Sequence, residues 1–412
     1  MIEADPEFVL GRALEIELTL MGNLTSPRFD KSLAGSIDEF NKLVEQKKDK
    51  LTEQERLHAV VVNHMAQNDL KQLNNVLERI ITLYPNDFLA LKMNQDTYFL
   101  VGKALPMRNS FAGALPKIKD SNPLKGYAHG MFAFALEESN MYPQAQREAI
   151  KALELIPRDT WAIHNYAHCL EMQGQAEEGL KWMYDKKSDW AECQTLACHQ
   201  YWHTALFSIN NDKYDDAIAL LDNEVLTRCV SSATSLDLHD ATSMVYRMEL
   251  VDLFAKANKT DSMMSQRERW SGIYEVCKPH KTDHLSGFND VHYMMSYLGM
   301  DDMQSAREMI DSIDEVPSLN EGQTVVKPLL EAMYQFKKGS YEACADIMQD
   351  LRFEIVKIGG SHAQRDVFEQ LLLVSALKSE KAYHNRLAER MLVERDTFFG
   401  RRLNQTELLA QA

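Results

Sequence analysis

The chain has 412 residues, of which 61 are acidic and 45 basic, giving a formal net charge of −16. An acidic surface of this size argues against non-specific binding to nucleic acid or to anionic membranes, because both attract basic patches. Pro (11) and Gly (17) are few for this length, which favours helices over a sheet. We therefore expect a helical protein with neither nucleic acid nor membrane as a partner.

The cysteines and the N-terminal residues indicate the cellular compartment. The six cysteines have no CxxC spacing, so they are expected to be reduced thiols and not a disulfide framework or a zinc ribbon. Acidic residues precede any apolar run at the N-terminus, which is not typical of a signal peptide. No stretch approaches the ~20 consecutive apolar residues of a transmembrane helix. The expected location is cytoplasmic.

The first clear repeat is predicted at 53–87. Its second half places Leu73, Leu77, Ile80 and Pro85 at the spacing of the second helix of a tetratricopeptide repeat. A weaker helical unit follows at 86–106. A loop is expected at 119–125, where Lys, Asp, Ser, Asn and Pro cluster.

Two repeats with a period of 34 residues are predicted at 126–159 and 160–193. Small residues recur at this period: Ala133 matches Ala167, and Ala145 matches Gly179. Small side chains at these positions allow the two helices of a repeat to approach closely. The spacing therefore predicts two adjacent tetratricopeptide-like helix pairs.

The pattern weakens toward the C-terminus. The repeat predicted at 194–228 places Ala217 four residues late, about one extra helical turn. Degenerate helical pairs are expected at 230–316, with loops at 280–290 and 316–324, and C-terminal repeats are expected at 325–400. Since no segment alternates with a period of two, no sheet is expected. The predicted fold is one all-α domain over 1–412, a solenoid of tetratricopeptide-like helix pairs that forms a superhelix around a concave groove.

Two similar histidine pairs are the main candidate for function. His164 and His168 lie in HNYAH, and His199 and His203 lie in HQYWH, 35 residues further on. An i,i+4 spacing places both imidazoles of a pair on one face of a helix. The offset of about one repeat predicts that adjacent repeats use the same position, so the four side chains should lie close together.

The repeat register predicts that these histidines face the groove. Glu137, with Glu138 beside it, is expected on the same face of the preceding repeat, and His58 occupies the equivalent position too far along the array to join them. Trp161 and Trp202 are available as stacking surfaces. The predicted groove-lining residues of the two histidine repeats are Trp161, His164, His168, Glu171, His199, Trp202 and His203.

Three hypotheses fit these histidines. The first is a metal site, because paired imidazoles with nearby carboxylates are common ligands for Zn, Fe, Mn or Cu. The second is an aromatic and polar lining that binds an organic ligand or a peptide. The third is a set of buried polar side chains that hydrogen-bond to their neighbours.

Weaker candidates lie nearer the C-terminus. Asn289 or Asp290 could cap a helix, and His292 could reach the groove as a fifth ligand. His239 and Asp240 could form a dyad, and the favoured alternative is a surface position with a helix-capping role. The HxxxH spacing of His280 and His284 falls in a predicted loop and is discounted.

The string GGSHAQRD, beginning at Gly359, has two interpretations. The first is a turn in which Ser361 caps the next helix and an Arg365–Asp366 ion pair docks the C-terminal helices. The second is an anion site built from Arg365 and backbone amides at one end of the groove.

Strings along nearly the whole chain resemble the tetratricopeptide repeat protein 38 family. They are DPEFVLGRAL, MFAFALEESNMY, WAIHNYAHCLEMQG, LACHQYWHTALF, FNDVHYMMSYLG, GGSHAQRDVFEQLL and MLVERDTFF. The resemblance implies a helical-repeat, cytosolic protein without an established activity. It also implies that His164, His168, His199, His203, Asp290, His292, Gln364, Arg365 and Asp366 belong to family motifs. The chain departs from the family at Arg12, where members commonly have His. Members usually also carry a further segment before the DPEFV-like string, which predicts a further helix ahead of this sequence.

Two functions follow as expectations. The first is binding of an unidentified protein, peptide or small molecule in a groove lined by His, Glu and Trp. The alternative is a metal-dependent hydrolase or oxygenase that uses His164, His168, His199 and His203 to hold a divalent transition metal. The chain shows no motif for nucleotide, flavin or nicotinamide cofactors, and a structural adaptor is a third hypothesis.

Overall fold

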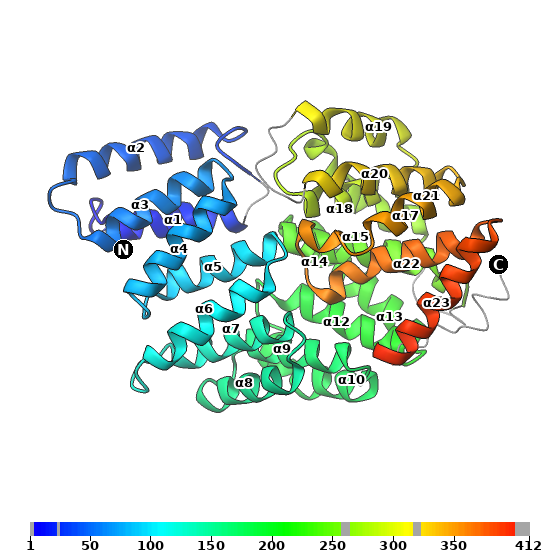
Figure 1. Cartoon of the computed structure of the whole chain (residues 1–412), viewed down its shortest axis with the longest axis horizontal. Helices are drawn as coiled ribbons and strands as arrows, with labels where there is room; N and C mark the ends of the chain where they lie inside the picture. Colours follow the sequence, from blue (N-terminus) through cyan, green and yellow to red (C-terminus); the bar gives the residue numbers. More distant parts are fainter. Residues whose placement is uncertain (1–3, 23–24, 257–263, 316–322, 400–412) are drawn as a thin grey trace.

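The computed structural model describes residues 4–22, 25–256, 264–315 and 323–399. Within these ranges the regular structure is entirely helical, and consecutive helices pack against one another along the chain (Figure 1). The predicted all-α class is therefore confirmed, and no strand occurs in the described ranges. None of the helices described combines the length and the apolar character needed to cross a bilayer.

The N-terminal helices pack in chain order around two hydrophobic cores, one among α1–α3 and one among α3–α7. Thr52 begins α3 in a capping box with Glu55, which satisfies two backbone amides at the helix start. The bounds are α1 Val9–Gly22, α2 Lys31–Lys47, α3 Glu53–Ala66, α4 Leu70–Leu83, α5 Phe88–Leu100 and α6 Ala104–Ala114.

The middle of the chain contains the helices in which the 34-residue period is clearest. The intervals 126–159 and 160–193 each contain a long helix pair, α7 with α8 and α9 with α10. A π-helical segment, Leu221–Val225, follows α13 at the repeat where Ala217 comes four residues late. The bounds are α7 Lys125–Glu137, α8 Tyr142–Leu155, α9 Thr160–Met172, α10 Ala176–Asp185, α11 Lys187–Trp190, α12 Ala197–Asn210, α13 Tyr214–Leu220 and α14 Leu226–Ser232.

The C-terminal helices share one large core with α9–α14. The loop predicted at 280–290 is shorter than expected, because α18 already begins at Gly287. The loop predicted at 316–324 lies largely outside the described residues. The bounds are α15 Ser235–Leu250, α16 Leu253–Lys256, α17 Gln266–Cys277, α18 Gly287–Gly299, α19 Met303–Ser312, α20 Gln323–Lys337, α21 Tyr341–Leu351, α22 His362–Lys378 and α23 Ala382–Phe399.

Helix α22 brings the two halves of the chain together. It packs against α9 and α15 as well as against its sequence neighbours, and it crosses the middle of the molecule in Figure 1. At its start, the backbone N–H of His362 donates to Glu138 at the end of α7, with an N–O distance of 3.0 Å. Just before it, Gly359 has φ 84°, and a Cβ there would lie 2.6 Å from the carbonyl oxygen of Leu100. Only glycine permits this close approach, so the turn before α22 packs against the end of α5, while α22 itself packs on α9.

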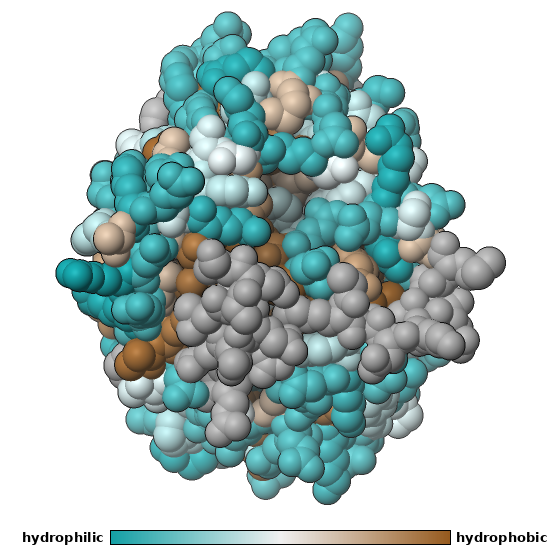
Figure 2. Space-filling model, turned by 90° about the vertical axis from the view of Figure 1, so that its right-hand side faces the viewer, coloured by the Kyte–Doolittle hydropathy of each residue, from teal (hydrophilic) through white to brown (hydrophobic). Residues whose placement is uncertain are grey.

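The surface agrees with the acidic composition. The face seen in Figure 2 is mostly hydrophilic, and the hydrophobic residues visible there are confined to small areas. Exposed large hydrophobic side chains are scattered over many helices, as is usual for a folded chain.

Gly179 provides a test of the small-residue pattern. It lies in α10, and a Cβ there would collide with the aromatic ring of Phe207 on α12. Gly179→Ala gains up to about 1 kcal/mol of helix propensity, but overpacking against a buried ring costs about 1–3 kcal/mol. We expect a net loss of stability in urea unfolding. Gly113→Ala is the control, because Gly113 lies on the exposed face of α6 and a Cβ there would have nothing within 4 Å. This variant should stabilise the chain. Equal changes in the free energy of unfolding of the two variants would contradict the prediction.

Candidate metal centre

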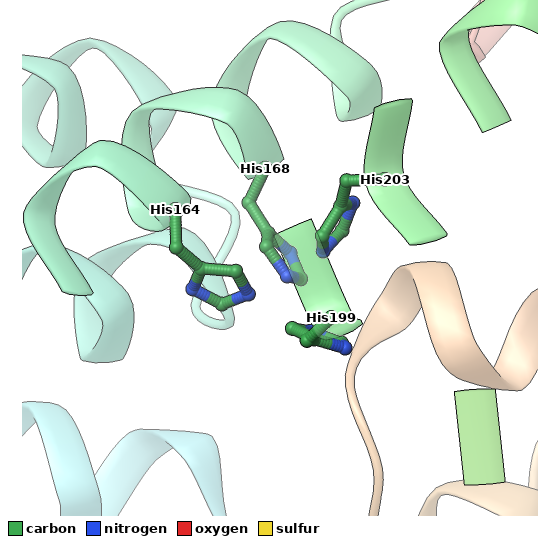
Figure 3. Close-up of side chains that lie close together, drawn as sticks. All are labelled: His164, His168, His199 and His203. Carbon is green, nitrogen blue, oxygen red and sulfur yellow. The ribbon is translucent and has the colours of Figure 1, made fainter. Parts of the chain in front are cut away.

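Four imidazoles meet between α9 and α12. His164 and His168 project from α9 toward His199 and His203 of α12 (Figure 3). The ring centroids are 4.4 Å apart for His164 and His168, 4.7 Å for His199 and His203, and 4.4 Å for His168 and His203. One nitrogen from each ring lies within 4.8 Å of the other three. The predicted convergence of the two pairs is present in the structure.

The cluster is fully enclosed. The four histidines are between 0% and 4% exposed, since α7, α15 and α22 pack around α9 and α12. Helix α9 is fixed at its start by Asp159, which accepts hydrogen bonds from the backbone N–H groups of Trp161 and Ala162. The side chains predicted to line a concave groove therefore line a closed interior site.

An oxygen atom lies within hydrogen-bond distance of Nδ1 in three of the four imidazoles. His203 Nδ1 is 2.9 Å from Glu171 Oε2, and His199 Nδ1 is 2.8 Å from Asp240 Oδ1. His164 Nδ1 is 2.9 Å from the side-chain oxygen of its neighbour Asn165, whose amide donates to the Gly130 carbonyl. A partner at Nδ1 fixes the orientation of each ring and leaves Nε2 as the acceptor nitrogen.

His168 differs from the other three. Its Nδ1 is 3.6 Å from Glu137 Oε2, within ion-pair range but beyond hydrogen-bond length. Both of its ring nitrogens are buried without a hydrogen-bond partner among the described residues, as are Nε2 of His164 and Nε2 of His203. An unpartnered polar atom in a protein interior is costly, so an ion or ligand bound to these nitrogens would offset that cost.

The electrostatics favour neutral imidazoles at two of the positions. Burial, reinforced by neighbouring histidines, holds the pKa of His164 and of His203 well below the usual range. Burial also acts to lower the pKa of His168, but Glu137 and the other nearby carboxylates outweigh it and raise that pKa. Burial raises the pKa of Asp240 to about 6, so it is still mostly ionised at pH 7. Neutral imidazole is the form that binds metal.

Two tryptophan rings stack on imidazoles of the cluster. Trp161 stacks on His164 at a centroid distance of 4.8 Å, and Trp202 stacks on His199 at 5.3 Å. Trp202 is completely buried and Trp161 is half-buried. The two tryptophans thus pack against the imidazoles and limit their rotation.

The predicted fifth ligand is not part of this cluster. His292 Nδ1 lies 2.6 Å from the carbonyl oxygen of Phe288, and its ring packs against His239. Asp290 is buried beside His284, whose Nδ1 is 3.2 Å from its carboxylate. The predicted cap at residues 289–290 is wrong, because Ser286 caps α18.

The two predicted dyads of adjacent residues are also wrong. Asp240 faces His199, whereas His239 Nε2 is 2.8 Å from Asn289 Oδ1. Arg365 does not pair with Asp366, because its guanidinium lies 3.4 Å from Glu138 and donates to the Gly360 carbonyl. The predicted capping of α22 by Ser361 is confirmed.

Sequence analysis missed two partners of the histidines. Asn165 directly follows His164, and Asp240 lies 41 residues beyond His199. Asp240 was considered only with its sequence neighbour. The position of Asp240 in the sequence could have identified it. Asp240 lies about one repeat plus two helical turns beyond His199, on α15, the next long helix that packs against α12.

No protein-family model matches the chain. The fold and the site therefore define its class from the residues alone: an all-helical protein whose packed helices enclose a cluster of four histidines.

His58, predicted to be remote from this cluster, forms a separate buried triad. Its Nε2 is 2.9 Å from Asp87 and its Nδ1 is 3.3 Å from Glu17, and all three side chains are nearly inaccessible. Burial acts to lower the pKa of His58, but the two carboxylates raise it to about 9. His58 therefore carries a positive charge that ties α3 to α1 and to the start of α5.

This triad predicts a loss of stability at high pH. Since the pKa of His58 is higher in the folded chain than its ordinary value of 6.5, its stabilisation is complete below pH 6.5 and lost as the pH passes 9. The loss is at most about 3 kcal/mol. Urea unfolding at pH 6.5 and pH 9.5 measures it, and His58→Gln should remove this part of the pH dependence. The same pH dependence in both proteins would contradict the assignment.

Proposed function

We propose that this chain is a metalloprotein whose four histidines bind a divalent transition-metal ion. One observation carries the proposal: one nitrogen of each of the four rings lies within 4.8 Å of the others, and Nε2 of His164, His168 and His203 is buried without a hydrogen-bond partner among the described residues. Oxygen atoms accept at Nδ1 of His164, His199 and His203. Metal-binding histidines have this arrangement, with Nδ1 held by a carboxylate or carbonyl and Nε2 directed at the ion. Four imidazoles suit Zn, Cu, Fe or Ni.

Charge balance supports a divalent ion. Four neutral imidazoles add no charge, and the carboxylates of Glu171 and Asp240 stand behind two of them. Two negative charges would neutralise a divalent cation inside the helices. Without an ion, the same interior would hold carboxylates and imidazoles with several polar atoms unpaired, which is unfavourable.

The enclosure of the site favours metal binding over capture of a peptide or protein in a groove. Each imidazole is at most 4% exposed, so a macromolecule has no surface to contact there. A closed four-ligand shell is typical of structural metal sites, whereas a catalytic site keeps one position open. We therefore propose that the ion joins α9 to α12, and a hydrolase or oxygenase remains the alternative.

For the fold, we propose a solenoid of tetratricopeptide-like pairs related to the tetratricopeptide repeat protein 38 family. The sequential helix pairs and the buried small residues at the 34-residue period support this assignment. The closure of α22 over α9 would distinguish it from an open superhelix.

Metal analysis of untagged protein, purified without chelators, tests the proposal. We expect near-stoichiometric transition metal in the wild type and none in the double variant His164→Ala/His199→Ala. The double variant His64→Ala/His280→Ala, at partly exposed positions outside the cluster, is the control and should keep its metal. Wild-type protein that stays metal-free after incubation with Zn²⁺, Cu²⁺ and Fe²⁺ would overturn the proposal.

Glu171 should act through His203 and not as a ligand. Its carboxylate is 2.9 Å from His203 Nδ1, and loss of such a partner typically weakens metal affinity 10–100-fold. We expect Glu171→Ala to bind the ion 10–100-fold more weakly in competition with a chromophoric chelator. Glu178→Ala, at an exposed position on α10, should keep the wild-type affinity; equal affinities in all three proteins would exclude this role for Glu171.

A further inference from the structure

Glu137, at the end of α7, is buried without the partners a carboxylate normally has. It is 0% exposed, and neither of its oxygens has a hydrogen-bond partner among the described residues. The nearest nitrogen is Nδ1 of His168, at 3.6 Å, and it too lacks a hydrogen bond. A carboxylate in a protein interior without a hydrogen bond or a close cation is strongly destabilised, so a cation bound between these groups would stabilise it.

Glu138 completes a group of three possible donors. It follows Glu137 on the same helix end and is 6% exposed. One oxygen from each carboxylate and one nitrogen of His168 lie within 4.8 Å of one another. Two ligands of one tetrahedral ion, each bound at ~2.0–2.2 Å, are roughly 3.3 Å apart. The 3.6 Å between Glu137 and His168 is therefore near the separation of two ligands of one ion, and too long for a hydrogen bond.

We propose that Glu137, Glu138 and Nδ1 of His168 bind a second divalent cation next to the four-histidine ion. This inference rests on the proposed function, since His168 would supply Nε2 to the first ion and Nδ1 to the second. The imidazole ring would then bridge the two ions as an imidazolate. Its Nδ1 proton passes to the solvent buffer as the second ion binds, and each nitrogen donates one lone pair.

The surroundings of Glu138 position it for this role. Its Oε1 accepts from the backbone N–H of His362 at 3.0 Å, and Arg365 lies 3.4 Å from its Oε2. These contacts come from the start of α22 and hold the carboxylate in place, with oxygen lone pairs still available. The corresponding contacts are absent at Glu137, which leaves both of its oxygens for the ion.

The donor set differs from that of the first site and indicates a different preference. Two carboxylates and one imidazole suit Zn, Mn, Fe or Cu, while four imidazoles suit Zn, Cu, Fe or Ni. Glu137, Glu138 and the imidazolate carry three negative charges, which balance a second divalent cation together with the guanidinium of Arg365. Zn²⁺ is therefore an ion that both sites can accept, and Cu²⁺ is a paramagnetic probe of both.

Titration of the full chain with Cu²⁺ tests the inference, with bound copper counted and the electron paramagnetic resonance spectrum recorded. We expect two equivalents in the wild type, with the signal reduced by magnetic coupling through the shared imidazole. Glu137→Gln keeps the size of the side chain but removes its charge, and it should bind one equivalent with the signal of an isolated Cu²⁺ ion. Glu148→Gln is the control, because Glu148 pairs with His129 at 2.6 Å outside the cluster, and it should match the wild type.

The outcomes separate the two proposals. No bound copper in the wild type would overturn the four-histidine centre and this inference with it. One equivalent in both wild type and Glu137→Gln would overturn the second site alone. Two equivalents with independent signals would exclude the shared imidazole. The wild-type count and spectrum decide these points even if Glu137→Gln does not fold.

Discussion

Removing the ion from the four-histidine cluster with a chelator should lower the free energy of unfolding by about 4 kcal/mol. The reference is the same protein at a free-metal concentration about 1,000 times the Kd of the cluster. An ion that binds only the folded chain stabilises it by mass action, and this figure follows from the ratio alone. The donors come from α9 and α12, so they converge only when these helices are packed together. Urea unfolding of the two forms measures the effect.

Two further measurements determine whether this loss arises at the cluster. His164→Ala/His199→Ala should unfold at the same urea concentration with and without metal. In the wild type, hydrogen exchange should accelerate most in α9 and α12 when the ion is removed. If the two wild-type forms unfold identically, the ion does not join these helices.

Asp366→Ala should destabilise the chain by about 3–5 kcal/mol. Asp366 lies 3.0 Å from Arg247 on α15 and 2.6 Å from Arg395 on α23, and both arginine side chains are only 5% exposed. Removing the carboxylate leaves two guanidinium groups buried without that counter-charge, the type of change for which buried ion pairs show large losses. Urea unfolding gives the change in free energy.

Glu369→Ala is the matched control on the same helix. Glu369 pairs with Arg352, but it is 31% exposed and Arg352 retains Glu394 at 2.7 Å. An ion pair of this kind contributes about 1 kcal/mol or less. Similar losses in the two variants would show that Asp366 does not hold the C-terminal helices together.

The convergence of the four histidines could be predicted because it depends on local geometry. The i,i+4 spacing within each pair places both rings on one helix face, and the offset of about one repeat places the pairs on adjacent helices. The small residues at Ala167 and Gly179 follow the same periodicity and are buried as expected. These features require no knowledge of how distant parts of the chain meet.

The errors share a different cause. Adjacency in sequence suggests the pairs His239–Asp240 and Arg365–Asp366, but neighbouring side chains on a helix do not face each other. Their actual partners, such as His199 for Asp240 and Glu138 for Arg365, come from helices distant in sequence. The enclosure by α22 has no periodic signal, so the sequence could not show that the expected groove is closed.

The position of α22 also has a consequence for biosynthesis. The last histidine of the cluster precedes α22 by about 160 residues, so at a synthesis rate of ~5–20 residues per second it emerges from the ribosome roughly 10–30 s before the helix that covers it. During this interval α9 and α12 can pair while their imidazoles are still accessible to small molecules. If the cluster binds an ion as proposed, the nascent chain would capture it readily, whereas exchange in the finished protein would require α22 to detach. The metal content of the mature protein would thus record the ions present while it was being made.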